Sequence, residues 1–421
     1  MSRKNKDSVR LYHVAGYRIL LQPTPLPIVN VECAINAGFV KETKQTSGVN
    51  HLLEHILTEA WTKCGTTCSG FWSNKGVDMN ASTDETILRY HTQGTPLYLD
   101  KMVAYITNIS THPVFKLKAL VKEKEAVIDE LLTYGNNPES KLDELFNEHF
   151  YTGGLVYRDN WKLQIENLKH LNLTEVKKVY KENYNPANIL FIVTGKFQTR
   201  HVLNLFAKEL MPRDIGNVFM PTVSCFSLHH AIYYSKQNST TTKIVIGWPT
   251  TITGHDSDSI YLNMLCGILN SILFKKLRTD MTLVYGVRFS YTLNVCGTAL
   301  LCNIYAREKN VVLCLQALIE TLTAFLTDFF PQHDIFAAVQ RETFNFYNKL
   351  PYTKDYLLQY MHQVNVDRPI VHSKKDKTQI LTKVTPQKLQ SLFKKIYNMQ
   401  QCLVVYQGKS DLKLSWEKIL M

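Results

Sequence analysis

An internal repeat constrains this chain more than any other feature of its sequence. A Tyr-Asn pair, a short apolar run and a Gly-Lys pair occur in that order at residues 184–196 and again at residues 397–409, which lie 213 residues later. The amphipathic stretch before each copy also matches at its apolar positions, which are Val176, Val179 and Tyr180 in the first copy and Leu389, Leu392 and Phe393 in the second. Chance could produce the apolar run alone, but the joint match predicts a duplicated domain.

The length and composition suit two ordinary globular domains. The chain has 421 residues, of which 45% are hydrophobic and 20% are charged, and this mix excludes a disordered or low-complexity protein. The stretch at residues 211–227 contains two prolines and a glycine and lacks periodicity, as expected of a link between domains. We therefore predict one domain at residues 10–211 and a second at residues 228–421.

Each half is expected to place clustered strands before a run of helices. In the first half we predict strands near 11–22, 28–37, 76–83, 86–93 and 188–194, with helices near 47–61, 96–110, 116–133, 139–150 and 174–183. In the second half we predict strands near 229–235, 242–248, 285–294, 297–306 and 401–407, with helices near 257–278, 309–329, 332–349, 354–364 and 385–397. This order predicts an α+β fold with two duplicated domains, each a mostly antiparallel sheet packed with helices on one face.

The formal charge of +12 raises the question of anionic partners. The basic residues are scattered along the chain, so a lysine-rich solvated surface is favoured over a nucleic-acid site. The most apolar long stretch, Val311 to Phe330, contains Glu320 and Asp328, and it predicts a core helix rather than a membrane span. We expect neither a nucleic acid nor a membrane as partner.

The nine cysteines form no regular framework, and an odd number favours free thiols in a reducing compartment. Cys64 and Cys68 could bind a second zinc ion, but without another Cys or His pair nearby we expect reduced thiols there too. Residues 1–7 are polar and basic with no apolar stretch behind them, so no secretory signal is expected. The first strand is predicted to begin near Leu11. These features favour an intracellular, cytoplasmic location over the mitochondrial matrix.

The sharpest chemical signal is the sequence HLLEH at residues 51–55, inside a predicted helix for which Ser47 is the expected N-cap. Residues four apart share a helix face, so His51 and His55 can bind one ion. Glu54 lies at the edge of that face, where its carboxylate can reach water on the metal without binding the metal. The pattern is the inverted zinc motif H-x-x-E-H, which chance would produce about 0.02 times in such a chain. Two surface histidines on a helix are the alternative.

A third metal ligand should come from another element. The helix predicted at 116–133 carries Glu123, Glu125 and Glu130, and Glu123 and Glu130 share a face because they are seven residues apart. A helix rich in glutamate is usually just solvated, and spacing alone does not choose among the three.

With these residues in view, the chain resembles the inverzincin metallopeptidases of the pitrilysin–insulinase group, which includes mitochondrial processing peptidase. It shares Ala37-Gly38, Glu42 and Gly48 with the family's first signature, in addition to HLLEH. Between His55 and Glu130 lie 74 residues, which is close to the family's spacing for its third ligand. The resemblance implies zinc ligands at His51, His55 and Glu130, a general base at Glu54, and an orienting carboxylate at Glu123.

The resemblance also implies residues that contact the substrate. Asn80-Ala81, followed by Thr83, is similar to the family's edge strand, which holds substrate by adding it as a β-strand. Arg278 and Tyr285, seven residues apart, resemble the second signature, whose side chains contact the carbonyl side of the substrate and can stabilise an oxyanion. The helix expected at residues 261–273 has neither histidine nor glutamate, so only the first half can hold zinc.

Together these residues imply a zinc-dependent endopeptidase with one Zn²⁺ per chain, which hydrolyses peptides or unfolded segments by attack of zinc-activated water. The alternative is a non-catalytic family subunit that binds peptide and works with an active partner, although such subunits typically lack one or more of the four site residues present here. Larger members of the family fuse two such halves in one chain, whereas this chain has the length of one half and carries both signatures. The resemblance therefore also implies a dimer, either of two identical chains or with a family paralogue. In such a dimer Arg278 and Tyr285 would act at the zinc of the partner chain.

Overall fold

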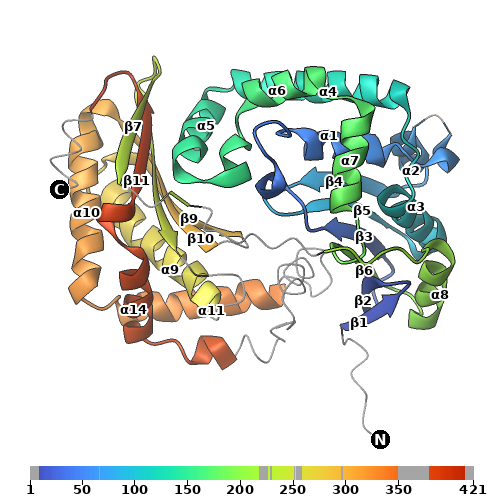
Figure 1. Ribbon diagram of the computed structural model, residues 1–421. Helices are drawn as coiled ribbons and strands as arrows, with labels where there is room; N and C mark the ends of the chain where they lie inside the picture. The colour runs from blue at the N-terminus through green and yellow to red at the C-terminus, as the bar shows by residue number, and fades with distance from the viewer. Residues whose placement is uncertain are drawn as a thin grey trace, which may run out of the picture. The chain divides into compact units, whose positions relative to one another are not determined.

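The computed structural model describes residues 9–65, 67–217, 226–227, 230–250, 252, 258–294, 297–348 and 379–412 (Figure 1). Within these residues the chain divides into two compact units. The first contains residues 9–134 and 153–217, and the second contains residues 135–152 together with those from 226 onward. The helix expected at 354–364 lies outside the described residues. The expected domain limits, 10–211 and 228–421, stay a prediction.

A six-stranded mixed sheet forms the centre of the first unit, in the order β1-β2-β6-β3-β5-β4. The strands are β1 (Arg10–Val14), β2 (Tyr17–Pro23), β3 (Val29–Ile35), β4 (Asp78–Thr83), β5 (Leu88–Gly94) and β6 (Ile189–Gly195). Only the β2–β6 pair is parallel among these neighbours. β4 is therefore an edge strand of the described sheet, and β6 lies near its centre.

Helices pack on this sheet through alternating apolar residues of its strands, such as Tyr17, Ile19 and Leu21 of β2, which are fully buried. The helices are α1 (Val49–Thr58), α2 (Cys68–Ser73), α3 (Leu99–Thr111), α4 (Leu117–Asn136), α6 (Trp161–His170), α7 (Leu173–Asn183) and α8 (Thr199–Glu209). α1 also packs beside the edge strand β4, and this packing brings the HLLEH sequence to the edge of the sheet.

The second unit contains a five-stranded mixed sheet in the order β7-β11-β8-β10-β9. Its strands are β7 (Ala231–Lys236), β8 (Thr241–Thr250), β9 (Val284–Asn294), β10 (Gly297–Arg307) and β11 (Leu403–Gly408). Its helices are α5 (Pro138–Phe150), α9 (Asp258–Leu273), the π-helix η5 (Phe274–Asp280), α10 (Val311–Thr327), α11 (Gln332–Asn348) and α14 (Pro386–Ile396).

The two units share one topology, which confirms the predicted α+β fold with a duplicated domain. When β2 to β6 are matched in order with β7 to β11, the strand order is the same in both sheets, and the single parallel pair is the matching one. The repeated sequence forms α7 and β6 in the first unit and α14 and β11 in the second. The repeat therefore identifies the central β-strand of each unit and the helix before it.

Helix α5 covers the face of the second sheet that the other helices leave open. Phe146 and Phe150 of α5 lie directly over Gly247 of β8. The neighbours of Gly247 in the strand, Ile246 and Trp248, point the other way into the main core. In Figure 1, α5 and α10 accordingly lie on opposite sides of β7 and β11.

Two helical stretches, Ile260–Asp280 and Glu308–Thr327, are long and apolar enough to cross a membrane when judged by length and composition alone. Both supply the main core of the second unit. Leu265 and Leu269 of α9 and Leu318 of α10 are fully buried there. Packing against the sheet is therefore sufficient to explain why both stretches are apolar.

The glycines of the repeated Gly-Lys pair give a test of the fold. Gly195 has a φ of 118°, and a Cβ there would lie 2.0 Å from the carbonyl oxygen of Ile28. A Cβ at Gly408 would first meet the side chain of Thr242, at 3.0 Å. We expect Gly195→Ala to lower the free energy of unfolding by about 2 kcal/mol or more, because both the backbone conformation and the contact exclude a side chain.

The matched variant Gly408→Ala should lower the free energy of unfolding by less than about 1 kcal/mol, because only the side chain of Thr242 has to adjust. Thermal and urea unfolding of both proteins, followed by circular dichroism, measures the difference. Equal stability of the two variants would contradict this account of β6.

Candidate metal centre

The helix that carries the two histidines begins at a buried carboxylate. α1 follows Gly48, whose φ of 91° lies in the left-handed region that glycine adopts without strain. Glu42, which is 4% exposed, accepts hydrogen bonds from the N–H groups of Gly48 and Asn50, both at 2.9 Å. A helix leaves its first N–H groups without partners inside the helix. Glu42 therefore caps α1, and the prediction of Ser47 as the cap was wrong, since the Ser47 hydroxyl donates to the carbonyl of Tyr157.

Three potential metal ligands converge from two helices. His51 and His55 project from α1, and Glu130 projects from α4. Oε2 of Glu130 lies 3.6 Å from Nε2 of each histidine, and the ligand atoms of all three residues lie within 4.8 Å of one another. With bonds of about 2.1 Å, the ligands of a tetrahedral zinc ion are about 3.4 Å apart. The donor set and its spacing therefore fit zinc.

Other side chains contact two of the three potential ligands, His55 and Glu130. Nδ1 of His55 lies 3.5 Å from Oε2 of Glu123, and Lys122 donates to the other oxygen of Glu123 at 2.9 Å. Tyr134 donates to Oε1 of Glu130 at 3.0 Å, while the second oxygen faces the histidines. A carboxylate on the far nitrogen of a histidine fixes the orientation and tautomer of the ring. The orienting role of Glu123 stays a prediction, and its position suits that role.

Glu54 lies between the metal ligands and the edge of the sheet. Its Oε2 accepts a hydrogen bond from the hydroxyl of Thr83, the last residue of β4, at 2.7 Å. Burial raises the pKa of Glu54 to about 7, and the hydrogen bond from Thr83 opposes that rise. A carboxylate with a pKa near neutrality can both accept and return a proton during a reaction at neutral pH.

Burial, reinforced by the neighbouring His55, lowers the pKa of His51 to about 4. The imidazole of His51 is then neutral at neutral pH, which is the form that binds a metal ion. His51 is therefore already in the protonation state that a metal requires.

The edge strand β4 passes close to these groups. Asn80 on this strand is exposed and Ala81 is half-buried, and the N–H of Ala81 donates to the side-chain oxygen of Asn80 at 2.9 Å. An exposed edge strand can pair with an extended peptide through its main chain. The substrate-binding role of Asn80 and Ala81 stays a prediction.

Arg278 and Tyr285 lie in the second unit. Arg278 belongs to the π-helix η5, a rare type of turn that is frequent at functional sites, and it donates to the carbonyl of Val284 at 3.0 Å. The hydroxyl of Tyr285 accepts a hydrogen bond from Nε of Arg307 at 2.8 Å. Because a guanidinium only donates, this hydroxyl keeps its proton for a further acceptor. The contact of Arg278 and Tyr285 with substrate stays a prediction.

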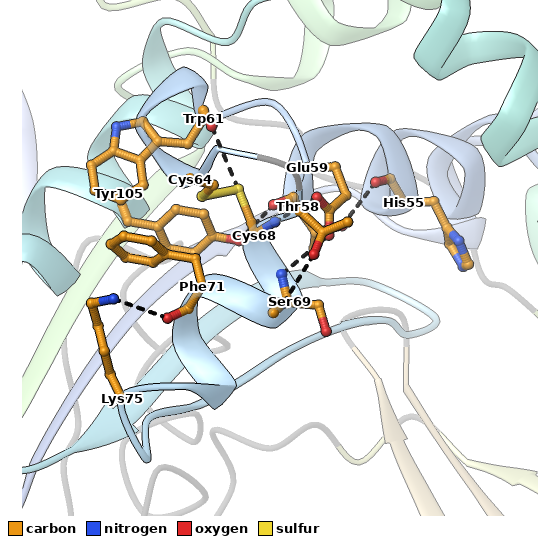
Figure 2. The surroundings of a disulfide bond; sticks show 12 residues. His55, Thr58, Glu59, Trp61, Cys64, Cys68, Ser69, Phe71, Lys75 and Tyr105 are labelled. Carbon is orange, nitrogen blue, oxygen red and sulfur yellow. Dashed lines mark hydrogen bonds between the residues drawn. A yellow bond between two sulfur atoms is a disulfide. The ribbon is translucent and has the colours of Figure 1, made fainter.

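The structure corrects one expectation about the cysteines. Cys64 and Cys68, expected to be reduced thiols, form a disulfide bond in the loop that follows α1 (Figure 2). Their Cα atoms lie 4.8 Å apart, within the range that a disulfide can bridge. The other cysteines that the structure describes are free and buried: Cys33, Cys266, Cys302, Cys314 and Cys402.

The segment held by this disulfide contacts the end of α1. The N–H of Cys68 donates to Oε2 of Glu59, the C-cap of α1, at 2.7 Å. Trp61 packs against Tyr105 and Phe71, and Tyr105 donates to the carbonyl of Thr58 at 2.8 Å. Figure 2 shows these side chains gathered beside the disulfide. His55 lies one helical turn before Glu59 in the chain. The C-terminal end of the histidine helix is thus fixed in its surroundings.

Comparison with known protein families gives one match on each half of the chain. The family described as Insulinase (Peptidase family M16) matches residues 18–158, and the Peptidase M16 inactive domain matches residues 170–341. The chain belongs to the M16 peptidase family. The first match contains the HLLEH sequence and Glu130, and the second contains Arg278 and Tyr285. This M16 chain is of the two-domain, half-length type found in mitochondrial processing peptidase.

The matched relatives are distant in sequence. The M16 chain is 22% identical over 284 residues to "Uncharacterized zinc protease YmxG" of Bacillus subtilis, a match that covers 66% of this chain and 68% of that protein. It is 22% identical to the beta subunit of mitochondrial-processing peptidase from Dictyostelium discoideum, over 50% of this chain and 44% of that protein. The second match thus spans less than half of its relative.

Solved structures show the same fold. A protease from Helicobacter pylori superimposes with a TM-score of 0.83 at 16% identity, over 96% of this chain and 99% of that one. The periplasmic protease PqqL from Escherichia coli matches with a TM-score of 0.77 at 16% identity, over 99% of this chain but only 49% of that one. The M16 chain described here therefore has the length of one half of PqqL.

Two contacts of the candidate metal centre were not predicted from the sequence. Tyr134 lies four residues after Glu130, so helical spacing could have paired them. Thr83 and Glu54 are 29 residues apart on different elements, and no local pattern in the sequence links them.

We expect Glu130→Gln to lose most of its zinc, because a neutral amide is a far poorer ligand than a carboxylate. The matched control is Glu125→Gln on the same helix, whose side chain is exposed and lies outside the ligand group. Metal analysis of both proteins after dialysis against a weak chelator measures the difference. Full zinc occupancy in Glu130→Gln would show that the third ligand is another residue.

Proposed function

We propose that this chain is a zinc-dependent endopeptidase that hydrolyses peptides or unfolded segments and holds one Zn²⁺. The observation that supports this most directly is the convergence of His51, His55 and Glu130 beside Glu54, whose carboxylate is not part of the ligand group. The zinc-protease names of several relatives agree with this chemistry.

Zinc, when bound, would polarise the scissile carbonyl and lower the pKa of water at its open position toward about 7. Glu54 would accept a proton from that water and later return it to the nitrogen of the leaving amine. Its raised pKa favours both steps at neutral pH. Thr83 holds the carboxylate by one oxygen, so that the other can face the reacting water.

The substrate would lie along β4 as an additional strand. Its main chain would pair with the outer side of the strand near Asn80 and Ala81, which would align the peptide without regard to most of its side chains. The N–H of Ala81, which now donates to the Asn80 side chain, would be available to the peptide once that side chain turns away. Arg278 and Tyr285 would stabilise negative charge on the carbonyl oxygen during attack.

We also propose that two chains form the working unit. Relatives of this chain are named as the alpha and beta subunits of mitochondrial-processing peptidase, and PqqL is about twice as long as the matched region. In the proposed dimer, either of identical chains or with a paralogue, Arg278 and Tyr285 of one chain act on peptide bound at the zinc of the other.

We expect Glu54→Gln to abolish hydrolysis while zinc stays bound, because Glu54 acts as base and not as ligand. Loss of a general base typically lowers the rate by about 10²–10⁴. Cleavage of a proteome-derived peptide library, analysed by mass spectrometry beside metal analysis, measures both effects. Normal turnover by zinc-loaded Glu54→Gln would contradict the role of Glu54 as general base. If the zinc-loaded parent protein binds peptides without cutting them, the result would favour the alternative of a non-catalytic subunit.

The dimer predicts complementation between two inactive variants. Glu54→Gln and Arg278→Ala are each expected to lack activity, yet mixed dimers should regain part of it, because one of their two sites has both residues intact. The measurement is peptide cleavage after subunit exchange, with mixed dimers demonstrated by two affinity tags. If demonstrated mixed dimers stay inactive, Arg278 does not act across the dimer.

A further inference from the structure

A second group of chemically active side chains lies at one end of the second sheet. A pocket of about 560 Å³ opens there, lined by the turn between β7 and β8, the start of β9, the end of β10 and the residue after β11. These segments meet because the register pairs Thr241 with Arg307, and Lys236 with Gly408. The pocket lies entirely within the second unit.

The pocket has an excess of positive charge. Arg307, Lys309 and Lys409 line it together with a single carboxylate, that of Glu308. In the part of the chain that the structure describes, no ion pair involves any of the three cations. Three cations close together repel one another, so an anion that enters the pocket relieves that repulsion as well as gaining direct attraction.

Tyr285 adds a directed hydrogen-bond donor to this charge. It lines the pocket and is 47% exposed. Nε of Arg307 donates to its hydroxyl oxygen, and the guanidinium lies 5.8 Å from the ring centroid. The hydroxyl proton therefore stays free for the carbonyl oxygen at which Tyr285 is proposed to act, and the side-chain amide of Asn238, which also lines the pocket, can donate to a second acceptor beside it. A carboxylate, with two oxygens that only accept, complements this arrangement.

We propose that this pocket binds a carboxylate of the peptide substrate, so that the enzyme prefers peptides with an acidic side chain or a free C-terminus beside the bond it cuts. This inference rests on the proposed function, because Tyr285 is the residue that links the pocket to the peptide. Lys309 and Lys409 supply the attraction, and Arg307 positions the hydroxyl of Tyr285. The preference concerns the substrate class, which the zinc ligands alone leave open.

Binding to an inactive protein tests the inference separately from catalysis. Three fluorescent peptides of equal length are titrated into full-length, zinc-loaded Glu54→Gln protein: one with an internal Glu, one with Gln in its place, and the Gln peptide with an amidated C-terminus. We expect at least one carboxylate-bearing peptide to bind about tenfold more tightly than the amidated Gln peptide at low salt. The Glu-to-Gln step reports an acidic side chain, and the amidation step reports the C-terminus.

The variant Lys309→Gln/Lys409→Gln is made in the Glu54→Gln background. It should bring the ratio of the affinities for the carboxylate-bearing peptide and the amidated Gln peptide close to one. Each exposed pair contributes about two- to fivefold in affinity. The matched control is Lys196→Gln/Lys208→Gln in the first unit, which removes the same charge from exposed positions. Lys196 is the counterpart of Lys409 in the internal repeat. Thermal unfolding of both variants shows that they are folded.

Equal binding of all three peptides would overturn the inference, and so would an equal loss of preference in the control variant, since net charge would then be the cause. Hydrolysis by the unmodified protein is measured with the same peptides. Cleavage without a carboxylate preference overturns the inference and leaves the peptidase intact. A preference in binding that is lost only in the pocket variant supports carboxylate binding by the pocket. If the unmodified protein nevertheless cleaves none of the peptides, the proposed function fails and carboxylate binding by the pocket still stands.

Discussion

The buried contact between Glu42 and the start of α1 determines where the histidine-bearing helix begins. Burial raises the pKa of this carboxyl to about 8, while the hydrogen bonds from Gly48 and Asn50 favour its charged form. The side chain of Asn50 donates in turn to the carbonyl of Gly38, and its oxygen accepts from Asn183 of α7. The first turn of α1 is thereby tied to two other elements of the unit. Since His51 is the next residue, its direction depends on this contact.

The other end of α1 is held just as firmly, but by different chemistry. The hydroxyl of Tyr105 on α3 binds the carbonyl of Thr58, and Glu59 binds the N–H groups of Cys68 and Ser69. A helix fixed at both ends cannot rotate, so the spacing of three and four residues within HLLEH becomes a fixed geometry in space. The two imidazoles then need only one further ligand, and α4 provides Glu130 at 3.6 Å from both.

Those features of the structure that depend on residues close together in the sequence could be predicted from it. The duplicated fold and most strands and helices follow from the repeat and from periodicity, and the HLLEH spacing places two ligands on one face. The short helices α2, α6 and α8 were not predicted, and one strand was expected where β1 and β2 form an antiparallel pair. The family resemblance singled out Glu130, which spacing alone could not separate from Glu123 and Glu125. The bond from Thr83 to Glu54, the cap at Glu42 and the Cys64–Cys68 disulfide were missed or wrongly expected. The bond and the cap depend on where distant segments or loops meet, and the disulfide depends on how closely two cysteines four residues apart approach each other.

The duplicated topology explains how one fold supplies two kinds of chemistry. α1 lies between β3 and β4, and α9 lies between the matching strands β8 and β9, yet α9 offers no imidazole and is followed by the π-helix that carries Arg278. The sheet and its central strand need the same apolar pattern in both units, so β6 and β11 remain alike. The segments at the strand ends carry no such packing constraint. In the first unit they are built around an anchored helix that carries two histidines. In the second they are built around a tyrosine whose proton is free to be donated, next to three cations that form no ion pair among the described residues. Duplication of the core with divergence at the strand ends is thus sufficient to separate the group of potential metal ligands in the first unit from the basic pocket in the second, which we propose to bind a charged peptide.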